Sequence, residues 1–205
     1  DSPHLSTDPD GSTMYNLMID IETLGTVPGC IITSIAAVFF DPLTGLCGKE
    51  FEVFIDPVNA EAQGQTLSLN TILWWMKQSD EARATLHSPT IKRLKLHEAL
   101  DAFHRFCEQH CHSKDLKPWG NGAGFDITHM ESLYRHYGSE PPWQFWNIRD
   151  VRTVQDLGVH IGFHKSQVPF EGIKHNALDD VKYQIAYTSE VFRRIDAMFN
   201  PDKTQ

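Results

Sequence analysis

Three stretches within the first 55 residues predict strands: the first is apolar, the second is apolar and β-branched, and the third alternates between apolar and polar residues. They cover residues 15–21, 31–40 and 46–55. The turn-forming sequence DPLTG separates the second stretch from the third, and DP ends the third. Because short turns join antiparallel neighbours, we expect a three-stranded antiparallel meander.

Apolar residues at helical spacing follow the meander and predict helices at 69–78, 80–87 and 96–111. Further along, we expect a short strand at 117–120, a helix at 127–137, and a short strand with a helix start within PPWQFWNIRDVRT (141–153). A polar loop with glycines at 158–172 precedes a final helix at 176–199. Three antiparallel strands followed by alternating helices and short strands predict an α/β fold with a mixed sheet.

Length and composition indicate one large folded domain. The chain has 205 residues, of which 40% are hydrophobic and 11% aromatic, and this excludes a disordered protein. No apolar run approaches the roughly 20 residues needed to cross a bilayer. The polar residues 1–13 are expected to be a cut-site remnant, a linker or a flexible leader, followed by the domain at 14–200 and a tail at 201–205.

Four cysteines at irregular spacing do not form a disulfide framework, which favours a reducing compartment, the cytoplasm. Within HRFCEQHCH (104–112), His104, Cys107 and Cys111 resemble half of a zinc site, but no second half exists, so helix packing is the favoured interpretation. The net charge of −9 argues against broad, nonspecific binding to duplex nucleic acid. It leaves open an active site that meets nucleic acid through metals.

Asp20 and Glu22 lie two positions apart in the first predicted strand and therefore project from the same face. Two buried anions repel each other unless a cation lies between them, so the pair suggests a divalent metal site. Asp126, after the glycine-rich NGAGF, suits the same site or the N-cap of a helix. His175 and Asp180 can also face one site, although a loop histidine and acids that favour a helix start are alternatives.

Three motifs together carry a family resemblance. DIET (20–23), NGAGFD (121–126) and HNALDD (175–180) resemble the exonuclease motifs of the DnaQ-like, or DEDDh, 3'-to-5' exonucleases. TILWWMKQ (71–78), WGNGAGFD (119–126) and RDVRT (149–153) resemble the branch of phage exonuclease A (DexA) and a mycobacterial exoribonuclease. The resemblance implies an RNase H-like mixed sheet flanked by helices.

The resemblance also implies roles for single residues. Asp20, Glu22, Asp126 and Asp180 would hold two divalent cations, Mg²⁺ or Mn²⁺, and His175 would be the general base. Asp179 competes with Asp180, which we prefer because the motif places four residues between the histidine and the acid.

The implied activity is a metal-dependent 3'-to-5' exonuclease that releases nucleoside 5'-monophosphates from single-stranded or 3'-overhang DNA or RNA. A catalytically weak nucleic-acid-binding or interaction domain, and a phosphodiesterase for short oligonucleotides, are the alternatives. A homodimer is possible, since related enzymes include dimers.

Substrate contacts are less specific. By the resemblance, Thr23 and Leu24 would meet the terminal nucleotide through a backbone amide and an apolar wedge. Either Trp74 or Trp75 could stack on a base while the other packs in the core, because adjacent helical residues point about 100° apart. Asn121 and Phe125 could shape the site wall, or they could be a turn-stabilising asparagine and a core phenylalanine. The basic run 91–95 could contact phosphate or begin a helix. Arg149 and Arg152 could pair with phosphate, or with Asp150 or Asp156.

Overall fold

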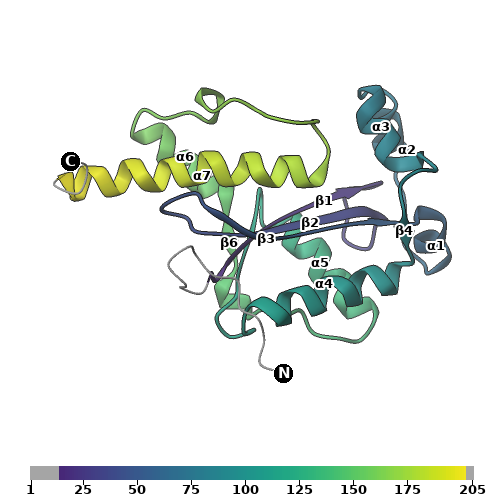
Figure 1. Ribbon diagram of the computed structural model, residues 1–205. Coiled ribbons are helices and arrows are strands. Elements are labelled where there is room, and N and C mark those ends of the chain that lie inside the picture. The colour runs from purple at the N-terminus through teal and green to yellow at the C-terminus, as the bar shows by residue number, and fades with distance from the viewer. Residues whose placement is uncertain (1–13, 202–205) are drawn as a thin grey trace.

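The computed structural model describes residues 14–201. The predicted leader at 1–13 and residues 202–205 of the predicted tail lie outside this range. A mixed six-stranded sheet in the order β4-β3-β2-β1-β5-β6 forms the centre of the molecule (Figure 1). Its strands are β1 (Asn16–Thr23), β2 (Ile32–Phe40), β3 (Cys47–Ile55), β4 (Arg93–Leu94), β5 (Lys117–Gly120) and β6 (Arg149–Asp150).

The first three strands pair antiparallel, and β5 and β6 add to β1 as parallel strands, which confirms the predicted fold class. The helices that flank the sheet are α1 (Pro57–Ala62), α2 (Leu69–Trp75), α3 (Asp80–His87), α4 (Leu96–His110), α5 (Asp126–His136), α6 (Val151–His160) and α7 (Ala177–Phe199). None of the helices within residues 14–201 combines the length and the apolar composition that crossing a membrane requires.

Helices cover both faces of the sheet. Figure 1 shows α4 and α5 below the sheet and the long helix α7 above it, with α6 beside α7. Two apolar clusters form in this way: Leu17, Ile19 and Ile21 of β1 belong to the α4/α5 cluster, whereas Met18 belongs to the α7 cluster. Because strand residues alternate between faces, Asp20 and Glu22 share the face of Met18 and lie on the α7 side.

Three local features differ from the prediction. The sequence DP after β3 stops the strand, as expected, but it also starts the short helix α1: Asp56 accepts from the amides of Val58 and Asn59, and Pro57 begins the helix. Residues 91–95 hold the two-residue strand β4, which pairs with the end of β3, before α4 begins at Leu96. Helix α2 ends at Trp75 rather than near residue 78.

The loop expected to begin at residue 158 begins later. Helix α6 continues to His160, and Gly158 is buried inside it, where an added Cβ would lie 2.8 Å from a methyl group of Val191 on α7. A glycine within a polar stretch favours a loop, but here Gly158 allows two helices to approach closely.

The zinc half-site is not supported. Cys107 and Cys111 are buried against the sheet, and His104 Nδ1 lies 3.1 Å from the Tyr134 hydroxyl. Within residues 14–201, the group of side chains close enough to share a metal ion is found elsewhere, at Glu22, His175 and Asp180.

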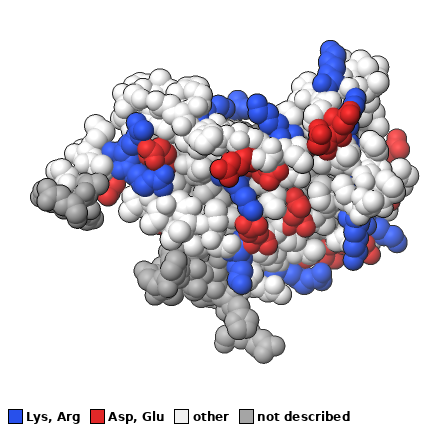
Figure 2. Space-filling model, turned by 45° about the horizontal axis from the view of Figure 1, so that its top comes forward, with Lys and Arg blue, Asp and Glu red and all other residues white. Residues whose placement is uncertain are grey.

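The surface carries mixed charge. On the face shown in Figure 2, Lys and Arg alternate with Asp and Glu, and the described residues form no broad cationic area there. Attraction for a polyanion on this face must therefore be local.

Candidate active site

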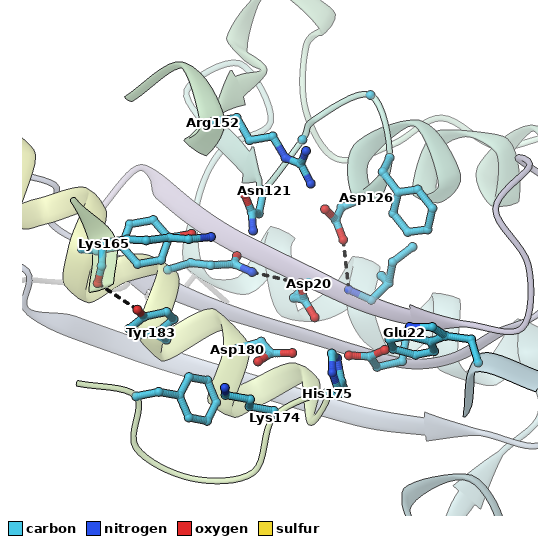
Figure 3. Close-up of a pocket in the computed structure, with 18 residues that line it drawn as sticks. Asp20, Glu22, Asn121, Asp126, Arg152, Lys165, Lys174, His175, Asp180 and Tyr183 are labelled. Carbon is cyan, nitrogen blue, oxygen red and sulfur yellow. Dashed lines mark hydrogen bonds between the residues drawn. The ribbon is translucent and has the colours of Figure 1, made fainter. Parts of the chain in front are cut away.

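An open pocket of about 720 Å³ lies where the carboxyl ends of β1 and β5 meet the first turns of α5 and α7. Figure 3 shows the carboxylates of Asp20, Glu22, Asp126 and Asp180 with His175 around it. The two acids of β1 form its floor, Asp126 opens α5, and Asp180 lies in the first turn of α7. Segments more than 150 residues apart thus converge on one cavity.

Specific hydrogen bonds fix two of these acids. Asp126 Oδ1 accepts from the Ile21 amide at 3.3 Å, which joins α5 to β1 between the two strand acids. Phe125, not Asp126, occupies the N-cap position of α5, so the N-cap interpretation of Asp126 was wrong. Asp20 Oδ1 accepts from Gln184 Nε2 at 3.1 Å, which joins β1 to α7.

The loop before Asp126 is attached to α6 by a single carboxylate. Asp150 accepts from the amides of Gly122 (3.3 Å), Ala123 (3.0 Å) and Arg152 (2.8 Å), and also serves as the N-cap of α6. Gly122 adopts φ 88°, a left-handed conformation that favours glycine, within this tight turn. The place of Asp126 therefore depends on Asp150, which does not touch the pocket.

Burial raises the pKa of all four acids, and repulsion among them raises the pKa of Asp20 and Glu22 further. For Asp20 the main cause is burial, followed by the charges of Asp126, Glu22 and Asp180, and the pKa lies well above its usual range. Burial, followed by the charge of Asp180, likewise raises the pKa of Glu22. Burial raises the pKa of Asp126 to about 7 and that of Asp180 to about 6.

No ion pair with Lys or Arg offsets this charge at any of the four acids within residues 14–201. The charge of Arg152 acts on Asp126 without forming an ion pair, and the clustered carboxylate oxygens form a hard-oxygen donor set. Mg²⁺ and Mn²⁺ prefer such donors, so the residues present fit the divalent cations predicted from the sequence.

His175 lies beside these acids. One of its ring nitrogens and one oxygen each of Glu22 and Asp180 lie within 4.8 Å of one another. Its ring packs edge-on against Trp74, with 4.8 Å between centroids. Burial and the nearby Lys174 lower the pKa of His175, so the imidazole is neutral at neutral pH and can accept a proton.

The two neighbouring acids of the last motif point in different directions. Asp179 Oδ2 accepts from the Ile173 amide at 2.9 Å and braces the preceding loop. Asp180 lines the pocket and faces Glu22. The geometry therefore favours Asp180 over Asp179 as the fourth acid.

The aromatic candidates separate as the helical spacing predicted. Trp75 is 2% exposed and donates from its indole nitrogen to the Thr23 carbonyl, whereas Trp74 is 43% exposed and lines the pocket. Asn121 and Phe125 also line the pocket.

The two residues that follow the acids of β1 have different surroundings. Thr23 lines a second chamber next to the pocket. Leu24 does not line either chamber: its side chain is buried in the core, and its amide donates to the Ile31 carbonyl.

The two candidate arginines also differ in their contacts. Arg149 donates to the carbonyls of Trp146 and Ile148, and Arg152 lines the pocket. Neither guanidinium forms an ion pair with a carboxylate in the described part of the chain.

Several lining residues were missed by sequence reasoning. Tyr183, Gln184 and Tyr187 lie three, four and seven residues after Asp180, and all line the pocket from α7. This is the helical spacing of one face, so the signal was present in the sequence once Asp180 was placed. Lys165 and Phe170 come from the loop before α7, which has no periodicity to reveal them.

Comparison with known proteins places the chain in a family. A family model described as the 3'-5' exoribonuclease Rv2179c-like domain matches residues 15–192. The chain belongs to this family. Membership confirms the predicted DnaQ-like superfamily and the class that the family description states, a 3'-5' exonuclease.

A relative in enterobacteria phage T4, described as an exodeoxyribonuclease, is 25% identical in an alignment of length 165 that covers 68% of this chain and 70% of the phage protein. Among solved structures, exonuclease I of E. coli in complex with a dA13 oligonucleotide is similar in fold, with TM-score 0.57 and 16% identity. Exonuclease I of Methylocaldum szegediense gives TM-score 0.57 and 17% identity. Each alignment covers 91% of this chain but only 41% of the exonuclease I chain.

Proposed function

We propose that this chain is a divalent-cation-dependent 3'-to-5' exonuclease that removes nucleoside 5'-monophosphates from single-stranded nucleic acid or 3' overhangs. The observation that carries the proposal is the cluster of four carboxylates with raised pKa beside a neutral histidine, in one open pocket. A cluster that repels phosphate when empty suits a phosphate substrate only when cations are bound.

Asp20, Glu22, Asp126 and Asp180 are the proposed ligands of two Mg²⁺ or Mn²⁺ ions. When bound, such ions lower the pKa of water and stabilise negative charge on a leaving oxygen. His175 accepts the proton of the attacking water at the ring nitrogen that faces Glu22 and Asp180. Gln184 holds the Asp20 carboxylate in one orientation.

The substrate is held by groups around these acids. Trp74 presents an exposed face on which a base can stack, a contact worth about 1–3 kcal/mol that tolerates every base. Thr23, Asn121 and Phe125 are the proposed wall contacts. The family is described as an exoribonuclease and the phage relative as an exodeoxyribonuclease, so both RNA and DNA are candidate substrates.

The test is digestion of matched RNA and DNA oligomers, labelled at the 5' end, with Mg²⁺ or Mn²⁺. We expect a ladder that shortens from the 3' end, mononucleotide products, and no reaction in EDTA. Glu22→Gln is the inactive control. If no oligomer, single-stranded or with a 3' overhang, yields mononucleotide with either ion, the chain is a binding domain and the proposal fails. Turnover restricted to the shortest oligomers would instead indicate an oligonucleotide phosphodiesterase.

We also propose a cytoplasmic location and a homodimer. All four cysteines are free, as expected of a reducing compartment. Phe145 and Trp146, 77% and 61% exposed, offer an apolar surface of the kind that subunit contacts cover. Fractionation of cells and the molar mass in solution test these two points.

A further inference from the structure

The pocket and the adjoining second chamber differ in charge. The second chamber, of about 410 Å³, lies between Trp74, Trp75 and Phe125, and none of the residues that line it within 14–201 is Lys or Arg. The main pocket carries three cations, Arg152, Lys165 and Lys174, in its lining. Glu22 lies where the two cavities meet, since it lines both, and the other three acids line the main pocket.

Two of the cations, Arg152 and Lys165, face the same part of the wall (Figure 3). Lys165 Nζ lies 5.9 Å from the ring centroid of Tyr187, and the positive charge of Arg152 also acts on Tyr187. Asn121 lies between them in the close-up, and its Oδ1 accepts from Gln155, which leaves Nδ2 as a donor to the pocket.

The fold holds both cations in place without neutralising them. Lys165 begins a 3₁₀ turn, Lys165–Gln167, whose start is capped by His164, and its carbonyl accepts from the Tyr183 hydroxyl at 2.9 Å. Arg152 lies in the first turn of α6, against Gly122, where an added Cβ would be 3.2 Å from Arg152 Nε. Neither forms an ion pair within residues 14–201, so a ligand can still meet both, although the charge of Arg152 also acts on Asp126.

The substrate of a 3'-to-5' exonuclease has a matching asymmetry. On the 3' side of the bond to be cleaved, the terminal nucleoside ends in a free hydroxyl and carries no further phosphate. On the 5' side, every nucleotide adds a phosphate. The aromatic chamber, which lacks a cationic lining residue among those described, therefore suits the terminal nucleoside, and the cationic wall suits the 5' side.

We propose that Arg152 and Lys165 form a subsite for the phosphate immediately 5' of the cleaved one, with Asn121 Nδ2 as a third donor. This inference rests on the proposed function. The subsite makes the enzyme prefer strands with at least one phosphate beyond the bond that it cleaves.

Dinucleotides with and without a 5' phosphate test the subsite, because they differ by that single group. With Mn²⁺, we expect kcat/KM of the parent protein to be at least about fivefold higher for the 5'-phosphorylated dinucleotide, the effect of a charge-assisted hydrogen bond at a partly exposed site. Arg152→Gln and Lys165→Gln should each reduce this preference, and the double variant should abolish it. Each variant should lower kcat/KM more for the phosphorylated dinucleotide than for the unphosphorylated one, so the ratio of the two values is the quantity that tests the subsite.

Conservative and distant variants serve as controls. Arg152→Lys and Lys165→Arg keep the charge and should keep most of the preference. Lys182→Gln removes a lysine of α7 that pairs with Glu50 of β3 and does not line the pocket. This change should have no effect. Thermal melts establish that each variant is folded.

The possible failures are distinct. If the parent protein cleaves both dinucleotides equally well, or if the glutamine variants lose activity on both alike, the subsite does not exist and the exonuclease proposal stands. If the parent protein cleaves neither dinucleotides nor longer oligomers, the exonuclease proposal fails and the subsite falls with it.

Discussion

His175 adopts a backbone conformation that few residues other than glycine adopt. Its φ is 65°, in the left-handed region, immediately before Asn176 caps the long helix α7. Histidine is among the residues that tolerate this region, and strained positions of this kind cluster at functional sites. The conformation places the imidazole between Trp74 and the carboxylates of Glu22 and Asp180.

If His175 is the general base, His175→Ala should lower kcat by about 10²–10⁴, the usual contribution of a positioned base. Mn²⁺ affinity should change little, and raising the pH should restore part of the rate because hydroxide needs no protein base. A pH-rate profile and calorimetric titration with Mn²⁺ measure these effects.

His175→Asn provides a second variant that tolerates positive φ, and His160→Ala, on the exposed side of α6, provides a matched control with unchanged rate. Full activity of both His175 variants would exclude the general-base role. Loss of Mn²⁺ binding would instead make His175 a metal ligand.

At the scale of elements, the catalytic acids depend on contacts between segments rather than on any one of them. The loop that carries Asn121 and leads to Asp126 is held by Asp150, which belongs to the next strand and helix. One carboxylate thus fixes the start of α6 and the approach to α5 together.

Asp150→Ala should lower the free energy of unfolding by about 1–2 kcal/mol, through loss of a helix cap, and should also lower kcat because Asp126 loses its support. Asp56→Ala is the matched control: it removes the cap of α1, which lies outside the pocket. We expect a comparable loss of stability with kcat retained. Urea unfolding and steady-state kinetics separate the two effects, and equal kcat in both variants would contradict the role given to Asp150.

Contact between α6 and α7 depends on Gly158. At an exposed position of a helix, Gly→Ala stabilises the helix. Here the new methyl group would lie 2.8 Å from Val191. We expect Gly158→Ala to lower the free energy of unfolding by about 1–3 kcal/mol, as overpacking does.

The double variant Gly158→Ala/Val191→Ala makes room for the added methyl group. It should be more stable than the sum of the two single changes predicts, which a double-mutant cycle by denaturant unfolding measures. A single Gly158→Ala variant as stable as the parent protein would show that α6 and α7 are not in close contact there.

At the scale of the whole molecule, the unpaired acids connect stability to pH and to metal. The pKa of Asp126 is about 7 and that of Asp180 about 6 in the folded chain. In the unfolded chain an aspartate has a pKa near 3.9, so the folded state holds protons that the unfolded state has released between about pH 4 and 7. Stability of the metal-free protein therefore falls as the pH rises through this window.

We expect Tm of the metal-free protein to fall by at least about 3 °C between pH 5 and pH 8, since about 2–4 °C corresponds to 1 kcal/mol for a chain of this size. Mn²⁺ should raise Tm more at pH 8 than at pH 5, because it binds the deprotonated carboxylates. Scanning calorimetry with and without EDTA gives both values.

Asp126→Asn/Asp180→Asn should flatten the pH dependence and abolish the effect of Mn²⁺. A metal-free Tm that rises across the same range would show that these acids are already paired in the folded state.

The sequence by itself determined the side-chain repeat of each strand and helix, and the motifs. Alternation along residues 15–21 was enough to put Asp20 and Glu22 on one face, and helical spacing was enough to separate Trp74 from Trp75. The three acidic motifs were enough to identify the family, because the residue types and their order are local properties of the chain.

Only the tertiary structure decided which segments meet. The bond from Gln184 to Asp20 spans 164 residues, and Lys165 and Arg152 reach one wall from a loop and a helix that carry no shared pattern. The sequence signal at Gly158 pointed to a loop, and only the presence of α7 against it explains why a helix continues through it. Periodicity reports which side of an element is apolar, whereas the partner on that side follows from how the whole chain packs.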